Sequence, residues 1–176
     1  MMDKVLLAGF GGQGVMFMGK ILAYAGMLGN LEVCWIPSYG PEMRGGTANC
    51  SVILSDEEIH SPVIDQADGG IVLNKPSYDK FLSRIKPGGV LVVNSSIVHM
   101  DKVRDDIEIV AIPAGDMAHE IGNVNLANMV CLGALLPKLK LVTLDKIEKA
   151  LDEVVGRKKP ELYELNLTAI KKGLEF

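Results

Sequence analysis

The sequence predicts an α/β protein in three layers, with helices on both faces of a mainly parallel sheet. Short apolar runs typical of buried strands alternate along the chain with longer segments of helical periodicity. The 176 residues are 48% hydrophobic and 23% charged, which is ordinary for a globular protein and suits a single domain over residues 1–176. A glycine-rich turn stands between the first strand and the first helix.

The chain opens with a strand, a helix and a second strand. Residues 4–8 contain consecutive apolar side chains, as in a strand covered on both faces. Residues 15–28 carry apolar side chains at helical spacing, and Gly29 and Asn30 follow as a natural stop. Residues 32–36 read as the next strand, so we expect a right-handed crossover between parallel strands.

The section after the second strand predicts an antiparallel hairpin. Residues 48–54 read as a strand, residues 55–58 as a turn, and residues 59–63 as a short strand returning from it. This hairpin would make the sheet partly mixed.

The remaining elements alternate and then become helical. We expect strands over residues 71–73, 90–93 and 107–112, a helix over residues 75–85 and a turn over residues 86–89. Further helices are expected over residues 124–136, 144–155 and 161–172, with the apolar run around 129–136 buried. The predicted architecture is a three-layer α/β/α, Rossmann-like domain.

Composition excludes several classes of function. A net charge of −4 and 5% aromatic residues do not suit a nucleic-acid surface. No apolar run reaches the roughly 18 residues that cross a bilayer, and the first residues lack a leader pattern. We therefore expect a cytoplasmic protein with neither nucleic acid nor membrane among its partners.

The sequence offers no evident catalytic or metal-binding group. The three cysteines, Cys34, Cys50 and Cys131, lie far apart without a CxxC pair and are expected to be buried free thiols. The three histidines are scattered without the spacing of metal ligands. A Gly-x-Ser-x-Gly nucleophile motif is also absent.

The glycine turn is the first candidate site. Gly9, Gly11 and Gly14 have dinucleotide-type spacing, with Gly12 and Gln13 between them, and a helix start that attracts anions follows. A dinucleotide site also expects an acidic residue about 20 residues later, and the end of the second strand has none. Three uses stay open: a dinucleotide, packing alone, or a phosphate-bearing ligand completed by a partner chain.

The second candidate is the loop after the second strand, which we expect on the same carboxyl edge of the sheet. Glu42 and Arg44 could form a surface ion pair, or Arg44 could bind a phosphate or carboxylate with two hydrogen bonds. The candidate residues of this loop are Ser38, Tyr39, Gly40, Glu42, Arg44, Gly45 and Gly46.

Asparagines add a weaker signal at the same edge. Asn125 and Asn128 are three residues apart and share a helix face, directed at the ligand edge or at a partner, while Asn123 is the expected cap. Asn74 and Asn94 each end a strand there.

Together the two motifs, GFGGQG at 9–14 and SYGPEMRGG at 38–46, resemble the gamma subunit of 2-oxoacid:ferredoxin oxidoreductases. The resemblance runs from about residue 4 to residue 136. It is also carried by Ser55-Asp56, Ile59, Ser61-Pro62, Ala67-Asp68, Asn128-Met129-Val130 and Leu132-Gly133-Ala134.

The resemblance implies an accessory subunit of an oxidoreductase that acts on an oxo group with an iron–sulfur protein as acceptor. Such complexes oxidatively decarboxylate a 2-oxoacid, transfer the acyl group to coenzyme A and reduce ferredoxin. Thiamine diphosphate, Mg and [4Fe-4S] clusters are then expected on alpha, beta and delta (ferredoxin-like) partner subunits. This chain would hold no cofactor firmly, with coenzyme A as its candidate ligand, and 2-oxoglutarate is the expected oxoacid.

Two other functions remain. A free-standing nucleotide-binding oxidoreductase or regulator would need a ribose-binding acid and catalytic groups of its own. A pure scaffold subunit would bind no ligand. The isolated chain could also self-associate through an unpartnered interface.

Overall fold

The strands form one mixed sheet in the part of the chain that the computed structural model describes, residues 1–40 and 46–176. Within these residues the strand order is β2-β3-β1-β4-β5-β6, and β3 is antiparallel to both of its neighbours while the other pairs are parallel. The strands are β1 Met2–Phe10, β2 Glu32–Tyr39, β3 Thr47–Ser55, β4 Ala67–Val72, β5 Ile85–Asn94 and β6 Glu108–Ile112. The prediction of a mainly parallel, partly mixed sheet is confirmed.

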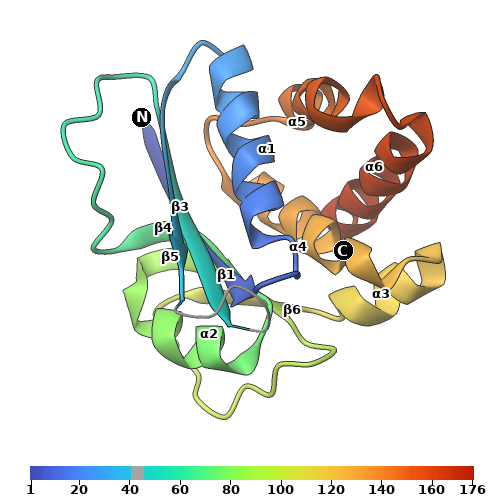
Figure 1. Ribbon diagram of the computed structural model, residues 1–176. Coiled ribbons are helices and arrows are strands. Elements are labelled where there is room, and N and C mark those ends of the chain that lie inside the picture. The colour runs from blue at the N-terminus through green and yellow to red at the C-terminus, as the bar shows by residue number, and fades with distance from the viewer. Residues whose placement is uncertain (41–45) are drawn as a thin grey trace.

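Helices cover both faces of this sheet (Figure 1). Side chains of β1 alternate: Val5 and Leu7 join the core beneath α1, α4 and α6, whereas Leu6 and Ala8 join the core beneath α2. The helices are α1 Val15–Leu28, α2 Lys75–Phe81, α3 Ala114–Ile121, α4 Ala127–Leu135, α5 Leu144–Leu151 and α6 Pro160–Leu174. In the described residues, none of them has the length and apolarity needed to span a bilayer.

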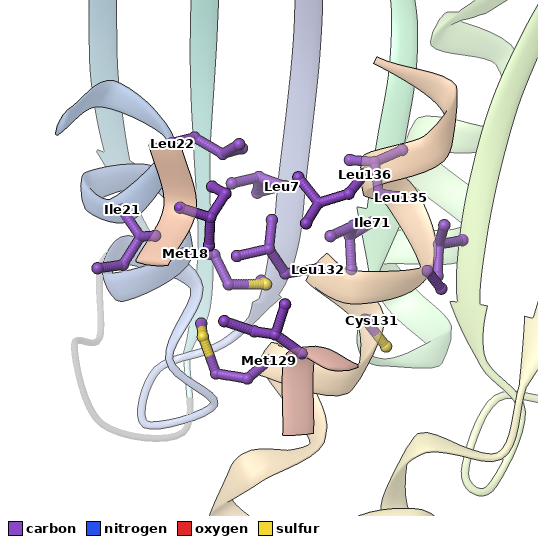
Figure 2. Close-up of a cluster of buried hydrophobic side chains, with 14 of the residues drawn as sticks. Leu7, Met18, Ile21, Leu22, Ile71, Met129, Cys131, Leu132, Leu135 and Leu136 are labelled. Carbon is purple, nitrogen blue, oxygen red and sulfur yellow. The ribbon is translucent and has the colours of Figure 1, made fainter. Parts of the chain in front are cut away.

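Helix α4 lies at the centre of the larger core. Every residue of this helix after Ala127 is buried, as the apolar run predicts. Figure 2 shows Met129 and Leu132 of α4 packed in one cluster with Leu7 of β1 and Met18 of α1. The helix therefore joins the sheet to the helical layer.

A close crossing fixes α4 against α6. A Cβ atom on Gly133 would overlap the carbonyl oxygen of Ile170, and one on Gly173 would overlap that of Val130. The two backbones are thus in direct contact, at a separation that only glycine permits on both sides.

The prediction that a strand at residues 59–63 pairs with β3 in a hairpin is wrong. Residues 59–63 form no strand, because both edges of β3 are already paired, with β1 on one side and β2 on the other. The antiparallel hairpin is β2–β3 instead. It also separates β2 from β1, so the two strands run parallel without being neighbours.

Several element boundaries also differ from expectation. The predicted turn at residues 86–89 lies inside β5, beside a register shift in its pairing with β4, and Gly88 takes a φ of 80° there. The predicted helix over residues 75–85 ends at Phe81 and closes with a 3-10 turn, since Ile85 already pairs in the sheet. Helix α3 was not anticipated.

The C-terminal helices match in place and differ at their ends. Helix α4 is flanked by 3-10 turns at Val124–Leu126 and Leu136–Lys138. Helix α5 passes into a π turn over Asp152–Gly156.

Two of the three thiols are buried, as expected. Burial raises the pKa of Cys50 to about 11 and that of Cys131 well above its usual range. Cys34 departs from the prediction, because it lies half-buried on the edge strand β2.

We predict that Gly133→Ala destabilises the protein by about 3 kcal/mol or more, because backbone atoms cannot move aside as a side chain can. The shift in urea midpoint measures this loss. Gly156→Ala is the control, since its added methyl meets only the flexible side chain of Asp152. Equal midpoints for both variants would contradict the close crossing.

We predict that iodoacetamide at pH 8 modifies Cys34 alone in the native protein and all three cysteines after denaturation. Cys50 and Cys131 are inaccessible, and their raised pKa values keep them as unreactive thiols. Intact-mass spectrometry counts the adducts. Native labelling of Cys131 as fast as that of Cys34 would refute the packing around α4.

Candidate functional site

The candidate site lies at the carboxyl edge of the sheet, between β1 and β4. The chain leaves β1 through α1 toward β2 on one side, and leaves β4 through α2 toward β5 on the other. Such a reversal of strand order opens a crevice where α/β proteins commonly bind ligands. The glycine turn stands at this reversal.

Two glycines of the turn have left-handed backbones, with φ of 93° at Gly12 and 77° at Gly14. A Cβ on Gly14 would overlap the side-chain nitrogen of Asn128, so this position needs glycine for conformation and for space. A Cβ on Gly12 would meet nothing within 4 Å. The backbone of Gly12 therefore faces open space.

Gln13 braces the turn from within. Its Oε1 accepts a hydrogen bond from the Phe10 amide at 2.6 Å, and its Nε2 donates to the Leu73 carbonyl at 3.2 Å. Asn74, which caps α2 by accepting from the Ser77 amide, also donates to Oε1 at 3.4 Å. Gln13 thus ties the ends of β1 and β4 together.

Gly9 serves packing. A Cβ there would lie 2.7 Å from Oε1 of Gln13 and 3.2 Å from Leu73, so a side chain would displace the brace. Gly9 was a predicted site residue, and the structure places it beneath the turn rather than on its open side.

Asn128 links α4 to the turn across 114 residues of sequence. It is 5% exposed, its Nδ2 donates to the Gly14 carbonyl at 3.2 Å, and its Oδ1 accepts from the Met129 amide at 2.9 Å. Asn125 is exposed, and its amide donates to Oδ1 of Asn123, the predicted cap. Of the two predicted asparagines, Asn125 is the one whose side chain is exposed at the edge.

The second motif meets the first, as the strand directions predicted. The Gly11 amide donates to the Gly46 carbonyl at 2.8 Å, and the Gly40 amide donates to the Thr47 carbonyl at 2.8 Å. Ser38 and Tyr39 are exposed at the end of β2, with Tyr39 opposite Ala48. Glu42, Arg44 and Gly45 lie outside the described residues.

The turn separates two hollows. The first, of about 290 Å³, we call the Tyr39 hollow, after a side chain that is 54% exposed. Its lining includes Gly11, Gly12, Gly14, Phe17, Tyr39 and Ala48. It lies on the side of the second motif.

The second, of about 320 Å³, we call the Asn94 hollow. Its lining includes Gly12, Leu73, Asn94, Gly115, Asn125 and Asn128. Sequence reasoning noted Asn94 only as a strand end and missed Gly115, because α3 was not anticipated. One sequence pattern could have indicated both residues: Asn94 ends one strand, and Gly115 comes just after the next strand.

In the described ranges, no group of three or more His, Cys, Asp or Glu side chains is arranged to hold a metal ion. Helix α1 begins at Val15, and its N-cap, Gly14, provides no side-chain cap. The arrangement suits backbone recognition of an anion at the start of α1, flanked by two small hollows.

Comparison with known sequences matches the chain to one protein family. Residues 4–176 match the protein family described as pyruvate ferredoxin/flavodoxin oxidoreductase. The chain is 38% identical over 178 residues to the 2-oxoglutarate synthase subunit KorC of Methanocaldococcus jannaschii, covering 99% of this chain and 94% of that one. It is 35% identical over 176 residues to the ketoisovalerate oxidoreductase subunit VorA of Methanothermobacter thermautotrophicus, covering 98% of this chain and 36% of that one. The chain thus spans about a third of the VorA subunits it matches.

Two solved structures have the same fold as this chain. The 2-oxoglutarate:ferredoxin oxidoreductase from Magnetococcus marinus, with 2-oxoglutarate, coenzyme A and succinyl-CoA bound, superposes with a TM-score of 0.90 at 27% identity, over 99% of this chain and 30% of that one. The gamma subunit of a keto/oxoacid ferredoxin oxidoreductase from Geobacter sulfurreducens PCA gives 0.82 at 31% identity, over 98% and 96% of the two chains.

We predict that Gln13→Ala lowers stability by about 1–2 kcal/mol, because the Phe10 amide and the Leu73 carbonyl lose their side-chain partner. Hydrogen exchange of the Phe10 amide should accelerate in the same variant. The exposed Gln66 supplies the control, Gln66→Ala, with neither effect. Unchanged exchange at Phe10 would show that the brace does not hold the turn.

Proposed function

Because the chain belongs to the pyruvate ferredoxin/flavodoxin oxidoreductase family, we propose that it is the gamma-type subunit of a complex that oxidises a 2-oxoacid. In this reaction the oxoacid loses carbon dioxide, the acyl group passes to the thiol of coenzyme A, and the electrons pass to ferredoxin. The match to KorC over 94% of its length and to the Geobacter gamma subunit over 96% supports a gamma-type role.

The chain contributes coenzyme A contacts and assembly to this complex. Thiamine diphosphate, Mg and the [4Fe-4S] clusters belong to alpha, beta and delta partner subunits. In the described residues the thiols of Cys50 and Cys131 are buried with raised pKa values, which makes neither a nucleophile at neutral pH.

One observation carries the coenzyme A proposal: the hydrogen bond from the Gly11 amide to the Gly46 carbonyl. It brings both glycine-rich motifs to the start of α1, where a helix dipole and uncapped first-turn amides favour an anion. Coenzyme A carries phosphates, and the Magnetococcus relative binds it. The open backbone of Gly12 allows a phosphate to approach closely.

Arg44, whose guanidinium is always charged, is the proposed source of positive charge for this site. Its side chain suits bidentate contact with a phosphate. Glu42, Gly45 and the exposed Ser38 and Tyr39 belong to the same motif and are proposed to contact the ligand or the partner subunits.

The oxoacid is expected to be 2-oxoglutarate. The support is the KorC relative, which this chain matches almost end to end, whereas the VorA relatives are much longer. Specificity itself would lie in the thiamine-binding subunits.

Purification of the complex through a tag on this chain tests the function. We predict copurification of partner subunits and reduction of ferredoxin that requires both coenzyme A and an oxoacid, fastest with 2-oxoglutarate among pyruvate, 2-oxoisovalerate and indolepyruvate. A tagged chain that purifies alone and binds NAD or FAD tightly would overturn the proposal in favour of a free-standing nucleotide enzyme.

We predict that Arg44→Ala raises the KM for coenzyme A about tenfold or more in the assembled complex, because a charge-assisted contact to phosphate is lost. The KM for the oxoacid should stay constant. Arg157→Ala is the matched control, since Arg157 is exposed and its one ion pair among the described residues is with Glu153. An Arg44→Ala complex that assembles, binds coenzyme A and turns over normally would remove Arg44 from the site.

A further inference from the structure

Asn94 is a buried side chain whose orientation is fixed by the backbone around it. It ends β5, is 4% exposed, and its Oδ1 accepts from the Gly115 amide at 3.2 Å and the Ser96 amide at 3.3 Å. If the side-chain amide were flipped, its NH₂ group would face these two N–H donors instead of an acceptor. The nitrogen Nδ2 must therefore point the other way.

Asn94 lines the Asn94 hollow, and its Nδ2 has no hydrogen-bond partner among the described residues. Every fully buried side-chain nitrogen or oxygen of the described residues has a hydrogen-bond partner. Because Nδ2 of Asn94 makes no hydrogen bond to these residues, it must keep some accessible surface. Asn94 is 4% exposed and lines this hollow, which makes the hollow the natural place for the accessible surface of Nδ2. Water can reach this donor in the free chain, and a ligand acceptor in the hollow would take the place of that water.

The walls around this donor are neutral. Of the described side chains that line the hollow none is charged, and Leu73, Ile97 and Val124 give it apolar sides. Ile97 and Val124 are 59% and 61% exposed, so they leave apolar surface open to a ligand. Asn125 adds a second exposed amide.

We propose that the Asn94 hollow binds a neutral group that places a hydrogen-bond acceptor on Nδ2 of Asn94 between apolar surfaces. The inference rests on the proposed function for its source: in coenzyme A, the adenine base and the pantetheine amides both have this chemistry. Gly12 lines both hollows, so one ligand can hold its phosphates at the turn and its neutral part against Asn94.

An NMR titration of the ¹⁵N-labelled full chain tests this with adenosine, pantetheine and pyrophosphate as probes. Adenosine or pantetheine should shift the Asn94 side-chain amide and the Gly115 backbone amide. A response to adenosine alone assigns the base, and a response to pantetheine alone assigns the amides. If neither probe moves these signals, or pyrophosphate alone does, the proposal is overturned.

Asn94→Asp supplies the matched variant. Its carboxylate still accepts from the Gly115 and Ser96 amides, but an oxygen replaces the donor in the hollow. The neutral probe should bind about tenfold more weakly or worse. Asn30→Asp adds the same charge at an exposed turn and should leave binding unchanged. Equal weakening by both variants, or by neither, refutes a role for Asn94, and the wild-type signals decide alone if Asn94→Asp does not fold.

The two proposals fail separately. Asn94 signals that respond to adenosine, in a complex that needs no coenzyme A, would uphold the hollow and reject the proposed function. A complex whose coenzyme A affinity depends on Arg44 but is unchanged by Asn94→Asp would do the reverse.

Discussion

The burial of α4 is the constraint on which the rest of the structure depends. This helix is buried on all sides, so the sheet, α1, α3 and α6 must all pack against it. Each fully buried leucine there contributes about 2 kcal/mol of hydrophobic free energy. The contact is close because Gly133 and Gly173 let two backbones meet. Since Asn128 at its start binds the Gly14 carbonyl, packing of the core also positions the glycine turn.

The place of β3 in the sheet shapes the rest of the site. Because β3 lies between β1 and β2, its first residue, Thr47, pairs with Phe10 at the end of β1. Gly46 directly precedes Thr47, which brings its carbonyl within reach of the Gly11 amide. In a fold where β2 pairs with β1, an acidic residue at the end of β2 would reach a ribose. Here β2 is the edge strand, and its end presents Ser38 and Tyr39 instead.

Local patterns predicted the local structure well. Helix α1 has the predicted bounds, Val15 to Leu28, because glycines flank an uninterrupted apolar periodicity. The meeting of the two motifs could also be predicted, since both follow strands that run in the same direction. Strand pairing could not: a strand at residues 59–63 is plausible locally, and only the occupied edges of β3 exclude it. Helix α3 escaped because Gly115 and Asp116 interrupt its short apolar pattern.

In the site, too, the local backbone conformations could be predicted and the long-range contacts could not. Gly12 and Gly14 have the left-handed conformations that the motif implies, and Gly12 faces open space, whereas Gln13 turns inward to Leu73 and Asn74, about sixty residues later. A motif assigns all of its residues to the ligand, but a turn that must stay open also needs residues that hold it. For Asn94 the sequence marks only a strand end, and the Gly115 amide, on a helix that was not anticipated, fixes its side-chain oxygen. The turn and the Asn94 side chain are therefore both held in place by residues far away in the sequence.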